Sequence, residues 1–459
     1  MRQTHEIDMR HGPLLGKILL FSVPLMCSGV LQLLFNAADI VVVGQFTGSN
    51  GGEAMAAVGS TSSLNTLIVN LFVGLSVGSN VLMARYYGAR DWEKAKQVVH
   101  TSILLAVASG CALLVIGLAL SAPVLRLMGT PENVLDQAVL YMRIIFVGMP
   151  AQMVYDFGAG LLRGVGDTRR PLIFLLISGV INVILNLIFV IVFHMGVAGV
   201  ALATILSQTI SAVLVVRCLM QGGTPYQLSL RKLCLSRDQA LQMVRIGVPA
   251  GMQGAVFAVS NVVIQSSVNS FGSVTVAGNT AAANLEGFVY TAMNAFYQAS
   301  LNFTSQNVGA RNYHRVIPIL LRCLTCVFVA GAGLGLLALT FARTLLGIYN
   351  SDPAVISAGL VRMGIIFLTY YLCGMMDVTC GSLRGMGYGV LPTVISVAGA
   401  CGLRLLWIAT IFSAQHTLEI LYLSYPVSWG ITLTAQLICF AIAYHKLRYH
   451  RSAGAVSMA

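Results

Sequence analysis

The chain has 459 residues, of which 57% are hydrophobic and only 9% are charged. Soluble domains carry about 25% charged residues, so a soluble fold of this length could not cover its surface with so little charge. The formal net charge of +12 does not indicate nucleic-acid binding, because most of the basic residues lie in alternate segments between long apolar runs.

The apolar residues form runs that are long enough to cross a bilayer, which takes about 20 residues per helix. Strand-like alternation of polar and apolar residues is absent, which argues against a transmembrane barrel. The sequence therefore predicts an all-α integral membrane protein with twelve transmembrane helices. The predicted spans cover residues 16–43, 55–84, 94–122, 134–160, 171–193, 197–219, 241–270, 275–306, 316–340, 355–381, 391–413 and 419–445.

Basic residues identify one side of the predicted membrane domain. They gather before the first span and after the second, fourth, sixth, eighth, tenth and twelfth spans, and the other connections hold almost none. Loops rich in Lys and Arg stay in the cytoplasm. We therefore expect a multi-pass protein of the cell (inner) membrane with both termini in the cytoplasm.

A motif in the first half of the chain returns 221 positions later with the same spacing. The two copies are Asp156-x6-Arg163-Gly164-x-Gly166-x4-Pro171 and Asp377-x6-Arg384-Gly385-x-Gly387-x4-Pro392. A repeat of about half the chain predicts two pseudo-symmetric six-helix bundles, and six spans per half make the two copies parallel in the membrane. The predicted parts are a lead (1–15), a first lobe (16–220), a linker (221–240), a second lobe (241–446) and a tail (447–459).

Four acidic residues fall inside predicted spans: Asp39, Asp156, Glu286 and Asp377. A carboxylate in the middle of a bilayer costs about 2.5–3.5 kcal/mol on insertion scales, so a cavity, a cation or a proton must offset the charge. A carboxyl group that is alternately buried and hydrated can carry a proton. An ionised carboxylate beside amide oxygens can instead bind a metal cation, and both interpretations stay open.

Polar residues of the first half could complete such a site around Asp39. Asn182 and Asn186 stand one helical turn apart and face the same way. Thr204 lies on the next predicted span. We predict an oxygen-rich cation-binding pocket in the first lobe. The structural alternative is that Asp39 bonds free backbone groups at a kink and that the asparagines join neighbouring helices.

The second half carries Arg404 inside a predicted span, close to the position that Asn182 has in the first half. An arginine at this depth needs a counter-charge, and Glu286 and Asp377 are the candidates. The hypothesis is a charge or substrate network of Arg404, Glu286, Asp377 and the repeat partner Asp156. Static ion pairs are the alternative, and for Asp156 the partner would be Arg163.

Other functional classes find little support in the sequence. The chain has no phosphate-binding Gly-x4-Gly-Lys-Ser/Thr loop, and nearly all of its histidines lie in loops or at span ends. Ten cysteines are scattered along the spans, and Cys323 and Cys326 have no partner ligands nearby in the sequence. We expect no enzyme activity, no resident metal, no cofactor besides a coupling Na+ or H+, no nucleic-acid partner, and a monomer.

In this order on twelve spans, the motifs resemble the multidrug and toxic compound extrusion (MATE) family, in particular its bacterial drug-efflux branch. The resemblance covers almost the whole chain, from about Leu15 to Tyr444. It rests on Val23-Pro24, Asn36-x-x-Asp39, Gly88-Ala89-Arg90 with Gly309-Ala310-Arg311, the repeated Arg-Gly-x-Gly-x4-Pro motifs, and Gly196-x-x-Gly199-x3-Ala203-Thr204-x2-Ser207-Gln208.

The resemblance implies export of cationic amphipathic compounds in exchange for Na+ or H+ by alternating access. It implies cation coupling at Asp39, Asn182, Asn186 and Thr204, with Asn36 in the same motif as Asp39. Several members have an aspartate at the position of Asn186, so the resemblance does not determine the ion. Residues 253–265 contain no acid, so a glutamate site that some members have there is not carried over. A flippase for lipid-linked precursors, from the same superfamily, is the alternative function.

Overall fold

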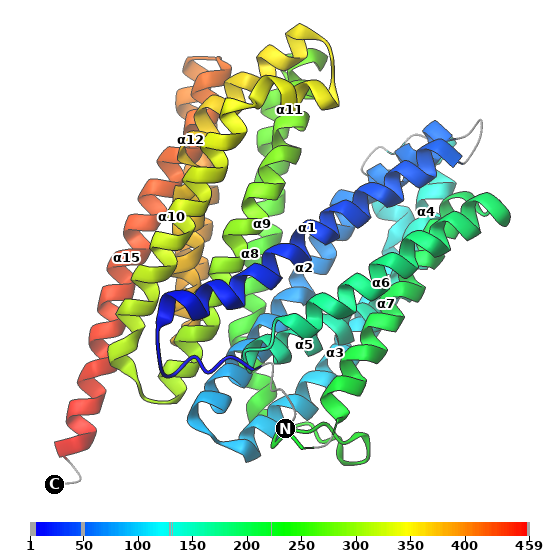
Figure 1. Ribbon diagram of the computed structural model, residues 1–459. Helices are drawn as coiled ribbons and strands as arrows, with labels where there is room; N and C mark the ends of the chain where they lie inside the picture. Colours follow the sequence, from blue (N-terminus) through cyan, green and yellow to red (C-terminus); the bar gives the residue numbers. More distant parts are fainter. Residues whose placement is uncertain (1–5, 47–50, 128–129, 131, 222, 457–459) are drawn as a thin grey trace. The chain divides into compact units, whose positions relative to one another are not determined.

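The computed structural model describes residues 6–46, 51–127, 130, 132–221 and 223–456, and these residues form helices joined by short connections (Figure 1). No β-strand occurs within these ranges. The predicted all-α fold is therefore confirmed. The start of the predicted lead (1–5) and the end of the predicted tail (457–459) lie outside the described residues.

The chain divides into two compact units. Unit 1 comprises Met1–Ile7 and Cys27–Ala255, and unit 2 comprises Asp8–Met26 and Val256–Ala459. Two long helices, α1 (Leu14–Phe46) and α8 (Arg237–Asn269), contribute to both units. Each contains a proline shortly before the residue at which it changes unit, Pro24 in α1 and Pro249 in α8. The lobe boundaries drawn from the repeat stay a prediction.

Unit 1 is built around α5, which packs against α2, α3 and α7, while α6 packs against α7. Its core is apolar and includes Leu113, Phe146, Met153 and Phe157, all fully buried. Besides its parts of α1 and α8, the unit contains α2 (Gly51–Ala89), α3 (Trp92–Leu127), α4 (Glu132–Val147), α5 (Met149–Gly164), α6 (Arg169–Leu187), η2 (Ile188–Val192), α7 (Gly196–Met220) and η3 (Leu230–Lys232).

Unit 2 is built around α12, which packs against α9, α10 and α15. Besides its parts of α1 and α8, it contains α9 (Ser273–Gly309), η4 (Tyr313–Arg315), α10 (Val316–Thr340), α11 (Ala342–Tyr349), α12 (Pro353–Gly385), α13 (Val390–Ser396), η5 (Val397–Gly402), α14 (Leu403–Trp407), η6 (Ile408–Phe412) and α15 (Leu418–Val456). The segments η2, η5 and η6 are π-helical, a local widening that is frequent at functional sites.

The sequence repeat corresponds to a repeat of backbone conformation. In the Arg-Gly-x-Gly turns, Gly166 and Gly387 have φ angles of 95° and 102°. In the Gly-Ala-Arg turns, Arg90 and Arg311 have φ angles of 57° and 59°. Glycine adopts positive φ at no steric cost, which explains the second glycine of each Arg-Gly-x-Gly motif. The two halves therefore end corresponding helices in the same way.

Helix α2 and the first part of α8 approach so closely in unit 1 that their backbones touch. A Cβ atom added to Gly74 would lie 2.2 Å from the backbone nitrogen of Gly251, and one added to Gly251 would lie 2.2 Å from the backbone oxygen of Leu71. Small residues permit such close approach between helices in membranes. The contact depends on the absence of side chains at these positions.

We expect Gly251→Ala to lower the thermal unfolding midpoint of the detergent-solubilised protein, because overpacking costs about 1–3 kcal/mol. Gly254→Ala on the same helix is the matched control, since the nearest atom to its added methyl group would be the Cβ of Asn70 at 3.5 Å, an ordinary contact. Equal midpoints for the two variants would contradict the close packing of α2 and α8.

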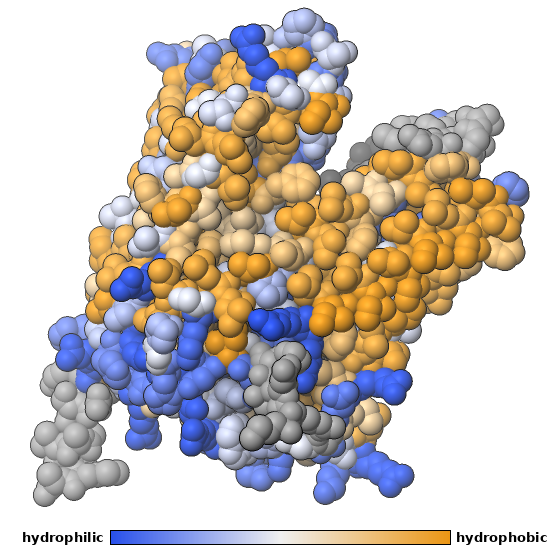
Figure 2. Space-filling model, in the orientation of Figure 1, coloured by the Kyte–Doolittle hydropathy of each residue, from blue (hydrophilic) through white to orange (hydrophobic). Residues whose placement is uncertain are grey.

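Nine helices within the described residues are long and apolar enough to cross a membrane, and the bent pair α4 and α5, with 49° between them, would make a tenth. Helices α2 and α9 do not meet this test, and α9 is rich in Asn, Ser, Thr and Gln. Figure 2 shows apolar residues over much of the visible surface, with hydrophilic residues gathered at the bottom of the view and a smaller group at the top left. This distribution fits helices that lie in a bilayer.

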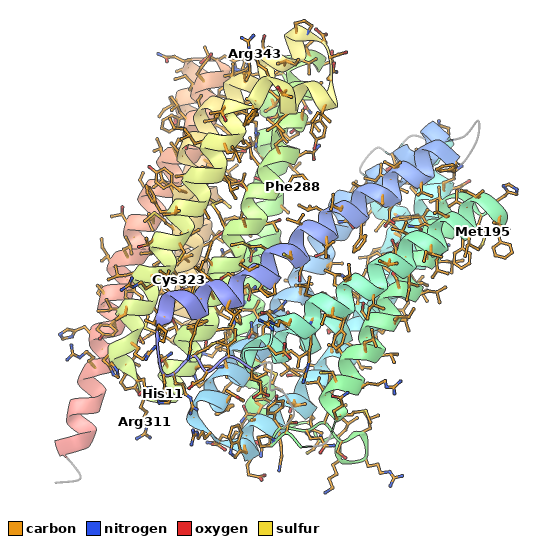
Figure 3. The ribbon with its side chains drawn as sticks, viewed as in Figure 1. His11, Met195, Phe288, Arg311, Cys323 and Arg343 are labelled. Atoms are coloured by element: carbon orange, nitrogen blue, oxygen red, sulfur yellow. The ribbon has the colours of Figure 1, made fainter. Side chains whose placement is uncertain are left out.

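Charged residues lie at both ends of unit 2, and Arg343 belongs to the few basic residues outside the predicted basic side. Figure 3 shows Arg311 and His11 at one end of the unit and Arg343 at the opposite end. The labelled Cys323 is buried in α10 and, like Cys326, is a free thiol. Within the described residues, no group of three or more His, Cys, Asp or Glu side chains could hold a metal ion.

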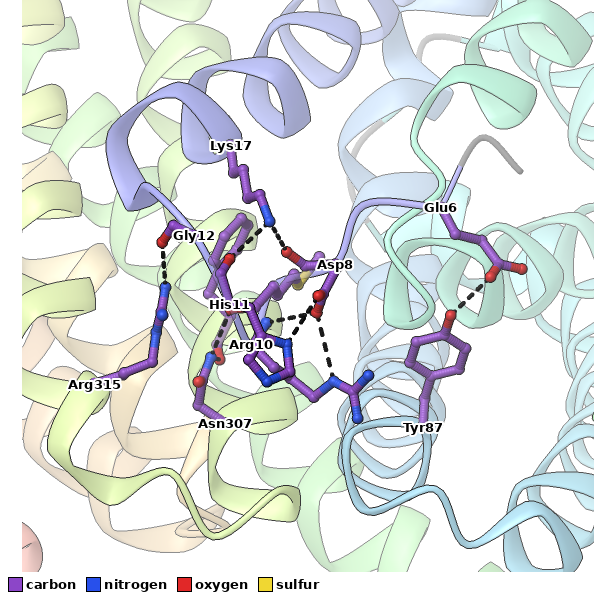
Figure 4. A network of polar contacts seen from close by, with 11 residues as sticks. Glu6, Asp8, Arg10, His11, Gly12, Lys17, Tyr87, Asn307 and Arg315 are labelled. Carbon is purple, nitrogen blue, oxygen red and sulfur yellow. Dashed lines mark hydrogen bonds and ion pairs between the residues drawn. The ribbon is translucent and has the colours of Figure 1, made fainter. Parts of the chain in front are cut away.

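Glu6 and Ile7 of the lead form hydrogen bonds within unit 1. The carboxylate of Glu6 accepts a hydrogen bond of 2.7 Å from the Tyr87 hydroxyl (Figure 4) and another from the Tyr226 hydroxyl. The backbone N–H of Ile7 donates to the carbonyl of Gly166 at 3.3 Å. Burial and the negative charge of Glu6 raise the pKa of Tyr226 well above its ordinary value, so this phenol stays a neutral donor.

The residues that follow contact unit 2 (Figure 4). The Asn307 side chain donates to the carbonyl of Met9 at 3.0 Å, and Arg315 donates to the carbonyl of Gly12 at 2.9 Å. Burial acts to raise the pKa of Asp8, but hydrogen bonds from His11 and from the backbone of Arg10 outweigh it and hold the pKa below its ordinary value. Residues 6–12 of the lead thus make specific contacts.

Candidate functional site

Four polar residues of unit 1 form a connected cluster inside the helix bundle. The Asn186 Nδ2 group donates to Asp39 Oδ1 on α1 and lies 3.2 Å from Asn182 Oδ1. The Asn182 Nδ2 group lies 3.5 Å from the hydroxyl oxygen of Thr204 on α7. The structure therefore brings together the acid, the two amides and the hydroxyl that the sequence analysis grouped, from α1, α6 and α7.

The local fold explains why these residues meet. Asn182 and Asn186 lie one turn apart on α6, so both point from the same face of the helix. That face packs against α7, which carries Thr204. Asn186 is fully buried and lies two residues before the π-helical segment η2, where the helical turn is wider.

One oxygen atom of the cluster and one further oxygen atom on α7 are buried without a hydrogen-bond partner among the described residues. They are Asn186 Oδ1 and Gln208 Oε1. Buried polar atoms are normally paired, so each orphaned oxygen is an acceptor that a ligand could use. Hard cations prefer oxygen ligands, and a proton can bind to the carboxylate. The arrangement suits either a small cation or a proton.

Asn36 was predicted to belong to this site, whereas Tyr141 was not. Asn36 is exposed, and the structure does not bond it to Asp39, so it does not join the connected group. Tyr141 on α4 lies within electrostatic range of Asp39 and packs against a small apolar group with Val58 and Val200. The sequence analysis did not name Tyr141. The residue at the corresponding position of the second half is an arginine, Arg362.

Unit 2 contains a buried ion pair that corrects the hypothesis for Arg404. Glu286 on α9 accepts two hydrogen bonds from Arg362 on α12, from Nε at 2.6 Å and from Nη2 at 2.8 Å. Arg362 also donates to Asn279 Oδ1 at 2.6 Å. The guanidinium is planar and matches both carboxylate oxygens, so Glu286 is neutralised by Arg362 and not by Arg404.

The sequence analysis named Arg404 and not Arg362, although both lie inside predicted spans. Arg362 could have been found from the sequence, because it is a basic residue inside the predicted span 355–381. At the corresponding repeat positions, the first half has Tyr141 for Arg362 and Asn65 for Glu286. The ion pair is therefore a feature of the second half only, as Asp39 is of the first.

Arg404 has a different environment from the one expected. Its Nε donates to the hydroxyl of Ser428 at 2.9 Å, and its guanidinium lies over two rings of α15, 4.2 Å from the centroid of Tyr425 and 5.3 Å from that of Trp429. Among the described residues, no carboxylate forms an ion pair with it. Cation–π attraction offsets part of the cost of burying the charge.

The repeat partners Asp377 and Asp156 also differ from each other. Asp377 accepts a hydrogen bond from Tyr290 and lies within electrostatic range of Arg384. Asp156 lies within range of Arg163, but its Oδ2 atom is buried without a hydrogen-bond partner in the described part of the chain. At the position of Tyr290, the first half has Val69, which cannot donate a hydrogen bond. The structure does not join Asp156, Asp377, Glu286 and Arg404 into one network.

Comparisons with known proteins agree on one family. The sequence model of the MatE family matches residues 24–188 and 249–410. The chain is 29% identical over 423 residues to "Probable multidrug resistance protein YoeA" of Bacillus subtilis (strain 168), covering 90% of each chain. It is 27% identical over 398 residues to "Probable multidrug resistance protein YpnP" of the same organism, covering 86% of this chain and 88% of the relative.

A solved structure has the same fold. The outward-facing conformation of a multidrug resistance MATE family transporter of the MOP superfamily superimposes with a TM-score of 0.89 at 22% identity, covering 98% of this chain and all of that one. This similarity confirms the predicted MATE-like fold of twelve transmembrane helices. Because the family model covers more than half of the chain, in two segments that follow the internal repeat, the protein is a membrane transporter of the MatE, or multidrug and toxic compound extrusion, family.

Proposed function

We propose that the protein is a secondary antiporter that exports cationic amphipathic compounds by alternating access, in exchange for Na+ or H+. Membership of a family of multidrug transporters supports the export of small molecules. The relatives are named multidrug resistance proteins, which favours drug efflux over flipping of lipid-linked precursors. The coupling ion and the direction of exchange are part of the proposal.

The observation that carries the proposal is the cluster around Asp39. A carboxylate is bonded to a fully buried amide, and an orphaned amide oxygen lies on that same side chain. In the proposed cycle the coupling ion binds to Asp39 with help from the oxygens of Asn182, Asn186 and Thr204. Loss of the ion returns Asp39 to its hydrogen bond with Asn186.

Asp377 is the candidate for substrate charge in unit 2. Its hydrogen bond from a tyrosine leaves the carboxylate without a bidentate partner, unlike Glu286. The strong pairing of Glu286 with Arg362 favours a structural role for that acid. Cytoplasmic termini and a monomeric transporter complete the proposal, with the positive-inside distribution as support for the orientation.

The test is transport by the purified protein in sealed liposomes, with ethidium as the fluorescent cation. A Na+ gradient and a proton gradient are imposed in separate experiments, each with an ionophore control that collapses it. We expect one gradient to drive ethidium accumulation and the other to have little effect, which would identify the ion. Absence of uptake under both gradients, from protein that is folded and correctly inserted, would overturn the proposal.

A further inference from the structure

The segment between α7 and α8 is held on unit 1 by hydrogen bonds, and its residues 226–236 are called the docking segment. In its first part, the backbone N–H of Leu228 donates to the carbonyl of Leu219 at 2.9 Å, and the hydroxyl of Tyr226 donates to Glu6. Tyr226 and Leu228 are both buried. This part of the docking segment is therefore attached by apolar as well as polar contacts.

The second part of the docking segment is attached through two neighbouring residues of α3. The backbone N–H of Ser229 donates to Nε2 of His100, and the backbone N–H of Ser236 donates to the hydroxyl oxygen of Thr101, both at 3.1 Å. Residues 230–235 between these two points are all exposed. Because Ser236 directly precedes α8, the two hydrogen bonds also fix the position at which α8 begins on unit 1.

The hydrogen bonds of His100 determine its protonation state. A backbone N–H can only donate, so Nε2 must present a lone pair to Ser229. The Nδ1 atom lies 2.7 Å from the carbonyl oxygen of Lys96, which can only accept, so Nδ1 carries the proton. His100 is therefore neutral while the docking segment is bound, and at 8% exposure it has little contact with solvent in this state.

A second proton on His100 is incompatible with the bond to Ser229. It would turn Nε2 into a donor that faces another donor, and a buried donor without an acceptor is costly enough to weaken the attachment about tenfold or more. Histidine is the side chain that ordinarily changes its charge between pH 5 and pH 8. The hydroxyl of Thr101 does not titrate in this range, so only one of the two bonds responds to pH.

The charged groups around His100 offer little compensation for an imidazolium. At the start of α3, Asp91 pairs with Lys94 and Glu93 pairs with Lys96, and no carboxylate within the described residues forms an ion pair with His100. Most of the charged groups at this end of the neighbouring elements are basic: Arg85 of α2, Arg163 of α5, Arg217 of α7, Arg231 and Lys232 of η3, and Asp238 of α8.

The two basic residues of η3 follow Ser229 by two and three positions. A positive charge on His100 would therefore repel the stretch of chain that its neutral ring holds. Loss of the hydrogen bond and repulsion act in the same direction, and both set in as the pH falls.

We propose that His100 is a pH switch that attaches residues 229–236 to α3 when its ring is neutral and releases them when its ring is protonated. Release frees the start of α8, a helix that contributes to both units and contains Pro249. The switch lies on the side that the basic loops assign to the cytoplasm. It is separate from the cluster around Asp39, so it goes beyond the proposed exchange of ions and responds to acidification of one side.

The first test is hydrogen–deuterium exchange of the purified wild-type protein in detergent at pH 8 and at pH 5, with labelling times corrected for the intrinsic effect of pH. We expect peptides from residues 229–236 to exchange at least about tenfold faster at pH 5, while the amide of Leu228 keeps its protection. Equal protection at both pH values would overturn the switch. A loss of protection spread evenly over α3 and α7 would overturn it too, because it would report general loosening of the unit.

Variants of the ring identify the group that titrates. His100→Gln keeps an oxygen that can accept from Ser229 but has no charge to gain, so we expect protection at both pH values. His100→Lys is charged at both, so we expect fast exchange at both. The matched control is His194→Gln, at an exposed histidine of the same unit, which should respond to pH as the wild type does. A folded His100→Gln variant that still loses protection at pH 5 would refute the role of His100.

The exchange measurement needs neither a gradient nor a transported compound, so its outcome is distinct from that of the antiport test. If a gradient drives ethidium uptake but residues 229–236 exchange equally at both pH values, the switch is wrong and the antiporter proposal stands. If the pH response is found but no gradient drives uptake, the switch stands and the antiporter proposal fails.

Discussion

Replacing Asp39 by asparagine should lower gradient-driven ethidium uptake in liposomes at least about tenfold. The amide keeps the size of the side chain but removes the negative charge, so it can neither exchange a proton nor neutralise a metal cation. Hydrogen bonds to a charged group contribute about 1.5–3 kcal/mol, so the cluster also loses its strongest interaction, the one with Asn186.

The matched control is Asp136→Asn, which makes the same chemical change at an exposed acid of α4 in the same unit. The double variant Asp39→Asn with Asn186→Asp is a second comparison, because it exchanges the two hydrogen-bonded groups and returns one carboxylate to the cluster. We expect part of the uptake to recover in the double variant. Normal uptake by Asp39→Asn under both gradients would remove Asp39 from the coupling mechanism.

Replacing Arg362 by methionine should destabilise unit 2 more than any other single change considered for that unit. Removing one partner of a buried ion pair leaves the other charge uncompensated and typically costs about 3–5 kcal/mol of unfolding free energy. Glu286 would lose both of its hydrogen bonds from Arg362, and Asn279 would lose one. The loss is measured as a lower unfolding midpoint of the purified protein in detergent.

A double variant tests whether the loss comes from the uncompensated charge. Arg362→Met combined with Glu286→Leu removes both charges, and such apolar replacement of a buried pair is often neutral or stabilising. We therefore expect the double variant to unfold at a higher temperature than Arg362→Met alone. Arg343→Met, at an exposed arginine of α11 in the same unit, is the control for the loss of an arginine. A single variant as stable as this control would contradict the importance of the pair.

The chemical composition of the site in unit 1 could be predicted from the sequence, because much of it follows from positions along one helix. Residues four apart on a helix face the same way whatever the helix packs against, so Asn182 and Asn186 had to act together. An acid inside an apolar span also signals a functional or paired group in any fold. Asn36 shows the limit of this reasoning, since a place in the same motif as Asp39 did not bring it into the connected cluster.

The partners across helices could not be predicted in the same way. Glu286 and Arg362 are 76 positions apart, and whether they meet depends on the rotation of α9 and α12 about their axes and on their depth in the bundle. The same holds for Arg404, whose place over the rings of Tyr425 and Trp429 follows from the packing of α15. Charge counting along the sequence pairs any acid with any base, so it offered Glu286 and Asp377 alike as partners of Arg404 and did not find the pair of Glu286 with Arg362.

The sequence by itself determined the membrane location, the all-helical fold and the internal repeat, because hydropathy and spacing are properties of the chain and need no knowledge of neighbours. Only the tertiary structure decided which buried charges are neutralised by a neighbouring side chain. That choice depends on distances of a few ångströms between side chains of different helices, and small rotations of packed helices change those distances without any trace in the hydropathy pattern.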